Sequence, residues 1–110
     1  MIELKEKFVF HVPLHKYINN ELITINQKVI DELYCLFEEN GYENAYITKV
    51  KGYYKSRAFD ELLITIFTSE TSEKPMPHVI FKKWFVENNN ILEQESLAYE
   101  YNNELFIEKL

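Results

Sequence analysis

One group of polar and aromatic side chains has the right types to bind an anion or to move a proton. Arg57 could hold a carboxylate or a phosphate through two parallel hydrogen bonds. Glu61 or Glu95, if removed from water among tyrosine and phenylalanine rings, would act as an acid or a base. The alternative is an ion pair between Arg57 and one of these glutamates that only holds a loop, with tyrosines packed on the arginine. No catalytic residue is singled out, and the predicted ligand-binding residues are Tyr53, Tyr54, Arg57, Glu61, Gln94 and Glu95.

The three histidines do not predict a metal site. His11 and His15 are four residues apart, a spacing that brings two ligands together only on a helix, whereas here Pro13 lies between them at the end of a predicted strand. The only cysteine, Cys35, lies among apolar residues of a predicted helix and is not at zinc spacing from any histidine. We expect His11 to be partly buried with a backbone partner, and we predict no metal ion and no other cofactor. His78, at a predicted helix start, has no supporting ligand either.

Nucleophilic catalysis has no support in the sequence. Ser56, Ser69 and Ser96 are available, but none lies in a Gly-x-Ser-x-Gly elbow. The chain has only 2 glycines, too few for a glycine-rich phosphate loop. Cys35 can form no internal disulfide, and its apolar neighbours predict a buried structural thiol.

The first half of the chain predicts a strand, a helix and a second strand. Residues 7–13 alternate with apolar side chains on both faces, which is typical of a central strand. A loop is expected at 15–23, followed by a capping box at 24–27 and a helix that ends at Asn40 and Gly41. Residues 44–54 form the next predicted strand, and Lys49 and Lys51 on one of its faces favour a position at the edge of a sheet.

The second half predicts a strand at 61–68, a polar loop at 69–74 and a helix that begins near Pro75 and Pro77. Ile80, Phe81, Trp84 and Phe85 form the apolar stripe of that helix, and we assign them to the core. Asn88–Asn90 should end it, before a strand at 91–101, a turn at Asn102 and Asn103, and a short strand at 105–107.

This order predicts one α+β domain, residues 1–110. We expect a ferredoxin-like βαββαβ sandwich, with two helices on one face of an antiparallel sheet and a C-terminal hairpin extension. Leu63 and Phe67 would point to the uncovered face, together with one of two sets on the first strand, Phe8, Phe10 and Val12 or Val9 and His11. An apolar patch of that size predicts a homodimer through the open face. Tyr99 and Tyr101 near the last hairpin are expected to be surface contacts.

The charge of the chain is unevenly distributed. The net charge is −6 over 110 residues, with six acids and one base from residue 87 to residue 110 and four bases without an acid from 49 to 57. A net-acidic chain is not expected to bind nucleic acid directly. No apolar run is long enough to span a membrane or to serve as a secretion signal, so we expect a cytoplasmic protein.

Three short pieces of the second half resemble a family of small bacterial proteins of unknown function. Residues 51–54 resemble its Gly-x-aromatic strand end, and Glu61 before the strand at 62–66 resembles its acidic residue. Residues 85–96 resemble its helix end and the Gln-Glu-Ser strand that follows. The resemblance implies a ferredoxin-like fold and no established activity. The chain departs from the family pattern in having Tyr54 where a tryptophan is expected and in lacking a secretion signal.

Two classes of function follow. The first is a dimeric, non-catalytic binding protein, in one version an inhibitor whose acidic residues 87–108 occupy the basic surface of a protein partner. The alternative is a small enzyme or small-molecule sensor, in which Tyr54, Arg57, Glu61 and Glu95 transfer a proton or bind a carboxylate.

Overall fold

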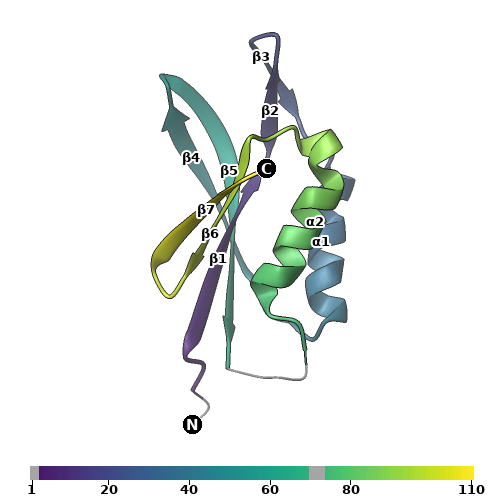
Figure 1. Ribbon diagram of the computed structural model, residues 1–110, viewed down its shortest axis with the longest axis vertical. Coiled ribbons are helices and arrows are strands. Elements are labelled where there is room, and N and C mark those ends of the chain that lie inside the picture. The colour runs from purple at the N-terminus through teal and green to yellow at the C-terminus, as the bar shows by residue number, and fades with distance from the viewer. Residues whose placement is uncertain (1–2, 70–73) are drawn as a thin grey trace.

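The computed structural model describes residues 3–69 and 74–110 (Figure 1). Its elements follow the predicted α+β order with an added hairpin between the first strand and the first helix. In chain order they are β1 (Glu6–Pro13), β2 (His15–Ile18), β3 (Glu21–Thr24), α1 (Gln27–Glu39), β4 (Tyr46–Tyr54), β5 (Arg57–Thr68), α2 (Pro77–Leu92), β6 (Ser96–Tyr101) and β7 (Glu104–Lys109). Most of the polar loop predicted at 69–74 lies outside the described residues.

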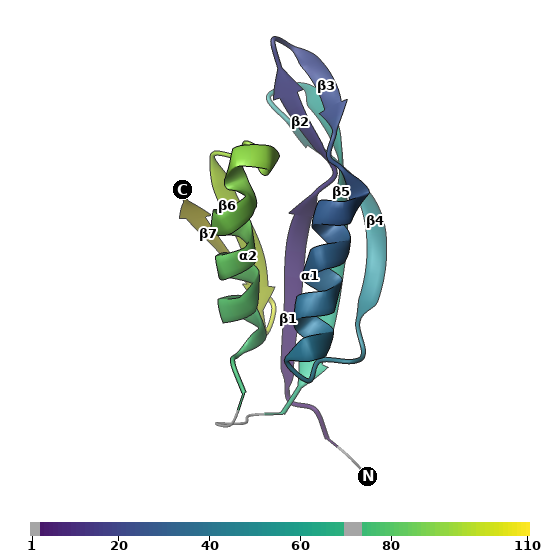
Figure 2. The same cartoon turned by 90° about the vertical axis from the view of Figure 1, so that its right-hand side faces the viewer.

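Five strands form one antiparallel sheet in the order β4-β5-β1-β6-β7, while β2 and β3 pair with each other in a separate hairpin. Both helices cover the same face of the five-stranded sheet, and the other face is open (Figures 1 and 2). β4 lies at one edge, as its two lysines predicted, and β7 lies at the other. The sheet therefore has a helix-covered face and an open face, and each strand contributes alternate residues to both.

β1 has a neighbour on each side, and its residues alternate between the core and the open face. Phe8, Phe10 and Val12 are at most 2% exposed and belong to the core under the helices. The Phe10 ring packs against the ring of Phe37 from α1 and that of Phe81 from α2, with centroids 5.3 and 4.8 Å away. Val9 and His11 consequently face the open side, which decides between the two sets that the sequence left open.

The predicted loop at 15–23 is in fact the β2–β3 hairpin, and helix α1 begins later than its predicted cap. Asn19 and Asn20 have φ values of 51° and 65°, the left-handed conformation that a two-residue hairpin turn requires. The hairpin carries β3 to Thr24, so Thr24 pairs with His15 and is not available to cap the helix. Asn26 caps it instead, because its side chain accepts a hydrogen bond from the backbone N–H of Lys28 at 2.9 Å.

The end of α2 differs from its prediction. The three asparagines do not stop the helix, which continues to Leu92, a residue with 0% exposure. Burying Leu92 favours the extra turn, and the left-handed Glu93 ends it. Residues 93–95 therefore precede β6 instead of forming its first part. Neither α1 nor α2, the helices of the described ranges, is long and apolar enough to cross a membrane.

Two side chains differ from the prediction in whether they are buried or exposed. Cys35, predicted to be buried, is exposed on α1. Tyr99, predicted to be a surface contact, is 7% exposed and packs between the rings of Phe10 and Phe106 at 6.2 and 5.4 Å. The reason for the second error is the strand register, because Tyr99 pairs with Phe10 and therefore faces the helix-covered side of the sheet.

Truncation of Phe10 tests the packing of this core. Phe10→Ala should lower the free energy of unfolding by about 3–5 kcal/mol, because it leaves a cavity between both helices and the sheet. Urea denaturation followed by circular dichroism measures this loss. Tyr53→Ala is the control, since the Tyr53 side chain is 75% exposed, and it should cost less than about 0.5 kcal/mol. Equal losses for the two variants would contradict the described core.

Candidate functional site

His11 lies between two glutamates on the open face of the sheet. Its Nδ1 is 2.8 Å from Oε1 of Glu61 on β5, and its Nε2 is 2.8 Å from Oε2 of Glu100 on β6. The strand register explains how one ring reaches both neighbours. Glu61 pairs with Pro13 and Glu100 pairs with Val9, so the two carboxylates approach His11 diagonally from opposite directions. We call this group the Glu61–His11–Glu100 cluster.

Both carboxylates favour the protonated form of the His11 ring. Only a doubly protonated imidazole can donate a hydrogen bond from each nitrogen at once. The hydrogen bond to Glu61 raises the pKa of His11 most, burial opposes that effect, and the bond to Glu100 adds to the rise. When the ring is protonated, its positive charge lies between the two carboxylates. The side chains are 22%, 21% and 32% exposed in the order His11, Glu61, Glu100, so a ligand can reach the group.

Apolar side chains share the open face with the cluster. Thr65 pairs with Tyr46 of β4, and Ala98 pairs with Ile107 of β7, so Tyr46 and Ile107 face the same side as the cluster. They are 66% and 64% exposed, and Phe67, also on this face, is 43% exposed. A charged group in such surroundings is screened less by water than one on a polar surface. The arrangement favours a ligand that combines positive charge with apolar groups.

Arg57 and the tyrosines beside it occupy another part of the molecule. The Arg57 Nη2 donates to Oδ1 of Asn20 at 2.6 Å, and its guanidinium lies 4.8 Å from the centre of the Tyr17 ring. Arg57 therefore holds the β2–β3 hairpin against the β4–β5 hairpin. Among the described residues Glu61 pairs with His11, so the alternative Arg57–Glu61 ion pair does not form. Four residues of strand, about 13 Å, separate the two positions.

The remaining predicted residues are also dispersed. Tyr53 and Tyr54 are exposed at the end of β4, on opposite faces because they are consecutive in a strand. The Gln94 amide donates to the carbonyls of Leu92 at 2.7 Å and His15 at 3.3 Å, which supports the chain after α2. Glu95 is exposed just before β6. Of the predicted ligand-binding residues only Glu61 belongs to the cluster, and a binding role for the others stays a prediction.

The sequence did not identify Glu100 or the true partners of His11. His11 was expected to have a backbone partner, whereas both of its nitrogens face carboxylates. The available signal was the alternation in β6, where Glu100 lies between two tyrosines and therefore points away from them. The histidine nitrogens are occupied by this bridging, and no group of three or more potential ligands in residues 3–69 and 74–110 is arranged to hold a metal ion.

Two solved structures share this fold over nearly the whole chain. A phage SAM lyase in complex with S-methyl-5'-thioadenosine is 12% identical, the match covers 96% of this chain and 89% of that chain, and the TM-score is 0.63. A phage SAM lyase in the apo state is 13% identical, with 100% and 95% covered and a TM-score of 0.59. No family model and no curated protein sequence matches the chain. At such low identity the likeness shows a shared fold.

These comparisons correct two expectations. The resemblance to a family of small bacterial proteins of unknown function was wrong, because no family model matches and the similar chains are phage SAM lyases. The prediction of a non-catalytic interaction protein is overturned as well, including its version as an acidic inhibitor of a basic partner. The two chains that share this fold are phage SAM lyases, which are enzymes. The predicted homodimer stays a prediction.

The stabilisation that His11 provides should depend on pH. A histidine whose pKa is raised in the folded state stabilises that state fully below its unfolded pKa of about 6.5, and the gain is lost as pH rises through the folded value. The difference in unfolding free energy between wild type and His11→Gln should therefore shrink by about 1–3 kcal/mol as the pH rises through the folded pKa of His11.

Urea denaturation from pH 5.5 to 9 measures that difference. His15→Gln, a histidine variant outside the cluster, is the control and should show no such trend. A difference for His11→Gln that grows with pH would contradict the described hydrogen bonds.

Proposed function

We propose that this protein is an enzyme that cleaves S-adenosylmethionine (SAM) and releases S-methyl-5'-thioadenosine. The observation that carries the proposal is the match to phage SAM lyase over nearly the full length of both chains. The Glu61–His11–Glu100 cluster supports it, since SAM carries two positive groups, a sulfonium and an ammonium, and the cluster offers two carboxylates on the open face. We also infer that the sheet order around β1 makes the βαββαβ core ferredoxin-like.

The reaction sets the role of the cluster. The bond between the sulfonium sulfur and the γ-carbon of the aminobutyrate chain breaks, and its electron pair moves to sulfur, which becomes a neutral thioether. The four-carbon fragment then either loses a β-proton to a base and forms a double bond, or forms a carbon–oxygen bond to its own carboxylate. Both routes balance without water or an added co-reactant. An anionic group beside the aminobutyrate chain can orient it in both routes and accept the proton in the first.

Charge changes during the reaction place the cluster against one part of the substrate. Positive charge disappears from sulfur as the bond breaks, so a carboxylate against sulfur would stabilise the substrate more than the transition state and slow the reaction. The ammonium group of the aminobutyrate chain keeps its charge throughout. We therefore assign Glu61 and Glu100 to that ammonium and its neighbouring carbons, with His11 fixing the orientation of both carboxylates. Action on a metabolite made inside cells fits a cytoplasmic location, which we include in the proposal.

Cleavage of SAM by the purified protein tests the proposal directly. Liquid chromatography with mass spectrometry should detect S-methyl-5'-thioadenosine and the four-carbon product above the amounts in buffer and in heat-denatured samples. Glu100→Gln and Glu61→Gln should each lower the rate about 10²-fold or more, the usual contribution of a positioned acid or base. Glu95→Gln, the same exchange at an exposed position outside the cluster, should keep the wild-type rate.

Two results would count against this assignment. A wild-type rate no higher than that of the denatured sample would exclude SAM cleavage. Equal rates for Glu95→Gln and Glu100→Gln, with activity present, would exclude the cluster as the site.

A further inference from the structure

The protonated ring of His11 occupies the two carboxylates that a cationic ligand of the cluster needs. Each ring nitrogen lies 2.8 Å from one glutamate oxygen, so Glu61 and Glu100 both accept a hydrogen bond while the ring is protonated. A cationic ligand that approaches this state meets carboxylates that already have a positive partner. Loss of the ring proton is therefore the event that makes a carboxylate available.

The neutral ring can donate to only one of the two glutamates. Neutral imidazole has one N–H donor, and the lone pair of its other nitrogen repels an oxygen acceptor. The proton should stay with Glu61, because the hydrogen bond to Glu61 raises the pKa of His11 most and because Glu61 is less exposed than Glu100. Nδ1–H then donates to Glu61, and the lone pair of Nε2 faces Glu100.

An ammonium group fits the place that the proton leaves. It has several N–H donors and no acceptor, so it can donate to the Glu100 carboxylate and to the free Nε2 of His11 at the same time. One positive charge then lies between the two glutamates before and after the exchange, and the displaced proton passes to solvent. Glu100 is the most exposed member of the cluster, which gives its side chain room to turn toward the ligand.

Other charged side chains lie too far along the open face to replace His11 in this exchange. β5 and β6, the strands on either side of β1, place the uncharged Leu63 and Ala98 directly opposite His11. Both helices lie on the other face of the sheet (Figure 2). The further charged residues that the five strands place on the open face are Lys7, Arg57 and Lys109. None of these three is among the groups that shift the pKa of His11.

We propose that the protonation of His11 controls ligand access to the cluster: the protonated ring holds both glutamates, whereas the neutral ring stays with Glu61 and leaves Glu100 and Nε2 to bind an ammonium group. We call this exchange the His11 switch. Glu100 is then the carboxylate that contacts the ammonium, and Glu61 is a positioning residue that orients the ring. The switch rests on the geometry of the cluster, and its action on the aminobutyrate chain of SAM rests on the proposed function.

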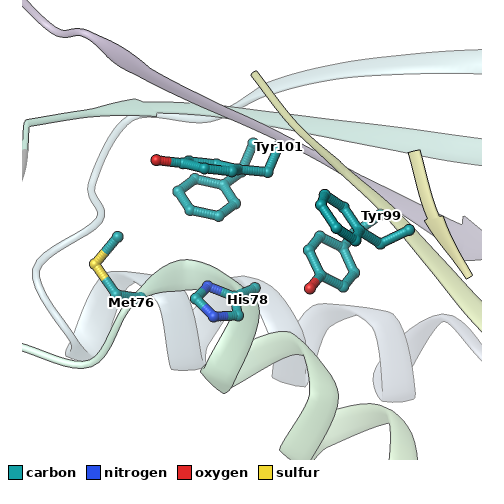
Figure 3. Close-up of a pocket in the computed structure, with 6 residues that line it drawn as sticks. Met76, His78, Tyr99 and Tyr101 are labelled. Atoms are coloured by element: carbon teal, nitrogen blue, oxygen red, sulfur yellow. The ribbon is translucent and has the colours of Figure 1, made fainter. Parts of the chain in front are cut away.

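The protonation of the ring can be measured without a ligand. Nitrogen-15 NMR of the histidine rings should show both His11 nitrogens protonated at low pH and only Nδ1 protonated at high pH, with the change above the ordinary value of about 6.5. His78 is an internal reference on the other face of the sheet, beside Tyr99 and Tyr101 (Figure 3). Burial and the charge of Lys82 lower its pKa, so the two rings titrate apart. A His11 proton on Nε2 alone at high pH would overturn the switch.

Propylammonium is the ligand probe, because it has an aliphatic ammonium group like that of SAM and no nucleoside. Its affinity, measured from chemical shifts of the protein, should rise about tenfold per pH unit up to the folded pKa of His11 and then stay level, since each bound ligand displaces one proton. His11→Gln removes the titrating ring, so the affinity of this variant should not change with pH. His15→Gln, a histidine variant outside the cluster, should follow the wild-type curve.

The carboxylate that binds the probe is tested by a matched pair of variants. Glu100→Gln should weaken propylammonium binding at least tenfold at high pH, because it removes the charge that the ammonium contacts. Glu95→Gln, the same exchange at an exposed position outside the cluster, should bind like wild type. Equal affinities for these two variants would overturn the switch.

The results separate the His11 switch from the proposed reaction. Propylammonium binding with the expected pH dependence, but without SAM cleavage, would support the switch and exclude the reaction. SAM cleavage together with a propylammonium affinity that stays constant or falls as pH rises would exclude the switch and leave the reaction in place. Absence of propylammonium binding at high pH would also overturn the switch. The NMR measurement on wild type decides the proton position even if His11→Gln fails to fold.

Discussion

Side chains alternate along a central strand, and the candidate site depends on that alternation in β1. Phe8, Phe10 and Val12 fill the space between the sheet and the two helices, while Val9 and His11 are placed on the other face. A register shift of one residue would bury the histidine and expose the phenylalanines. The cost of that exchange fixes the register, and the register in turn sets His11 between its two glutamates.

The sheet divides the chemistry of the molecule into two environments. On the open face, one imidazolium and two carboxylates satisfy one another among apolar side chains, and removal of one member would leave a charge without its partner. On the helix-covered face, neutral aromatic rings surround a nitrogen that lacks a partner.

The acidic C-terminal residues explain why charge counting misled the functional prediction. Many of the acids at 87–110 are neutralised locally: Glu93 and Glu108 pair with lysines at 3.0 and 2.6 Å, and Glu100 pairs with His11. Acids that are paired within the chain do not form a continuous surface for a basic partner. A local charge balance along the sequence contains no information about which bases the fold brings near.

The amino-acid sequence was enough to predict the α+β class, the main strands and helices, the edge position of β4 and the turn at Asn102, because alternation, helical spacing and asparagine turns are local properties. It also indicated that Glu61 was a candidate. The position of His11 between Glu61 and Glu100 could not be predicted in this way, since these residues are 50 and 89 positions from His11 and meet only through strand pairing. The same holds for α2, whose last turn forms because Leu92 is buried by elements distant in the chain, against the local preference of its asparagines.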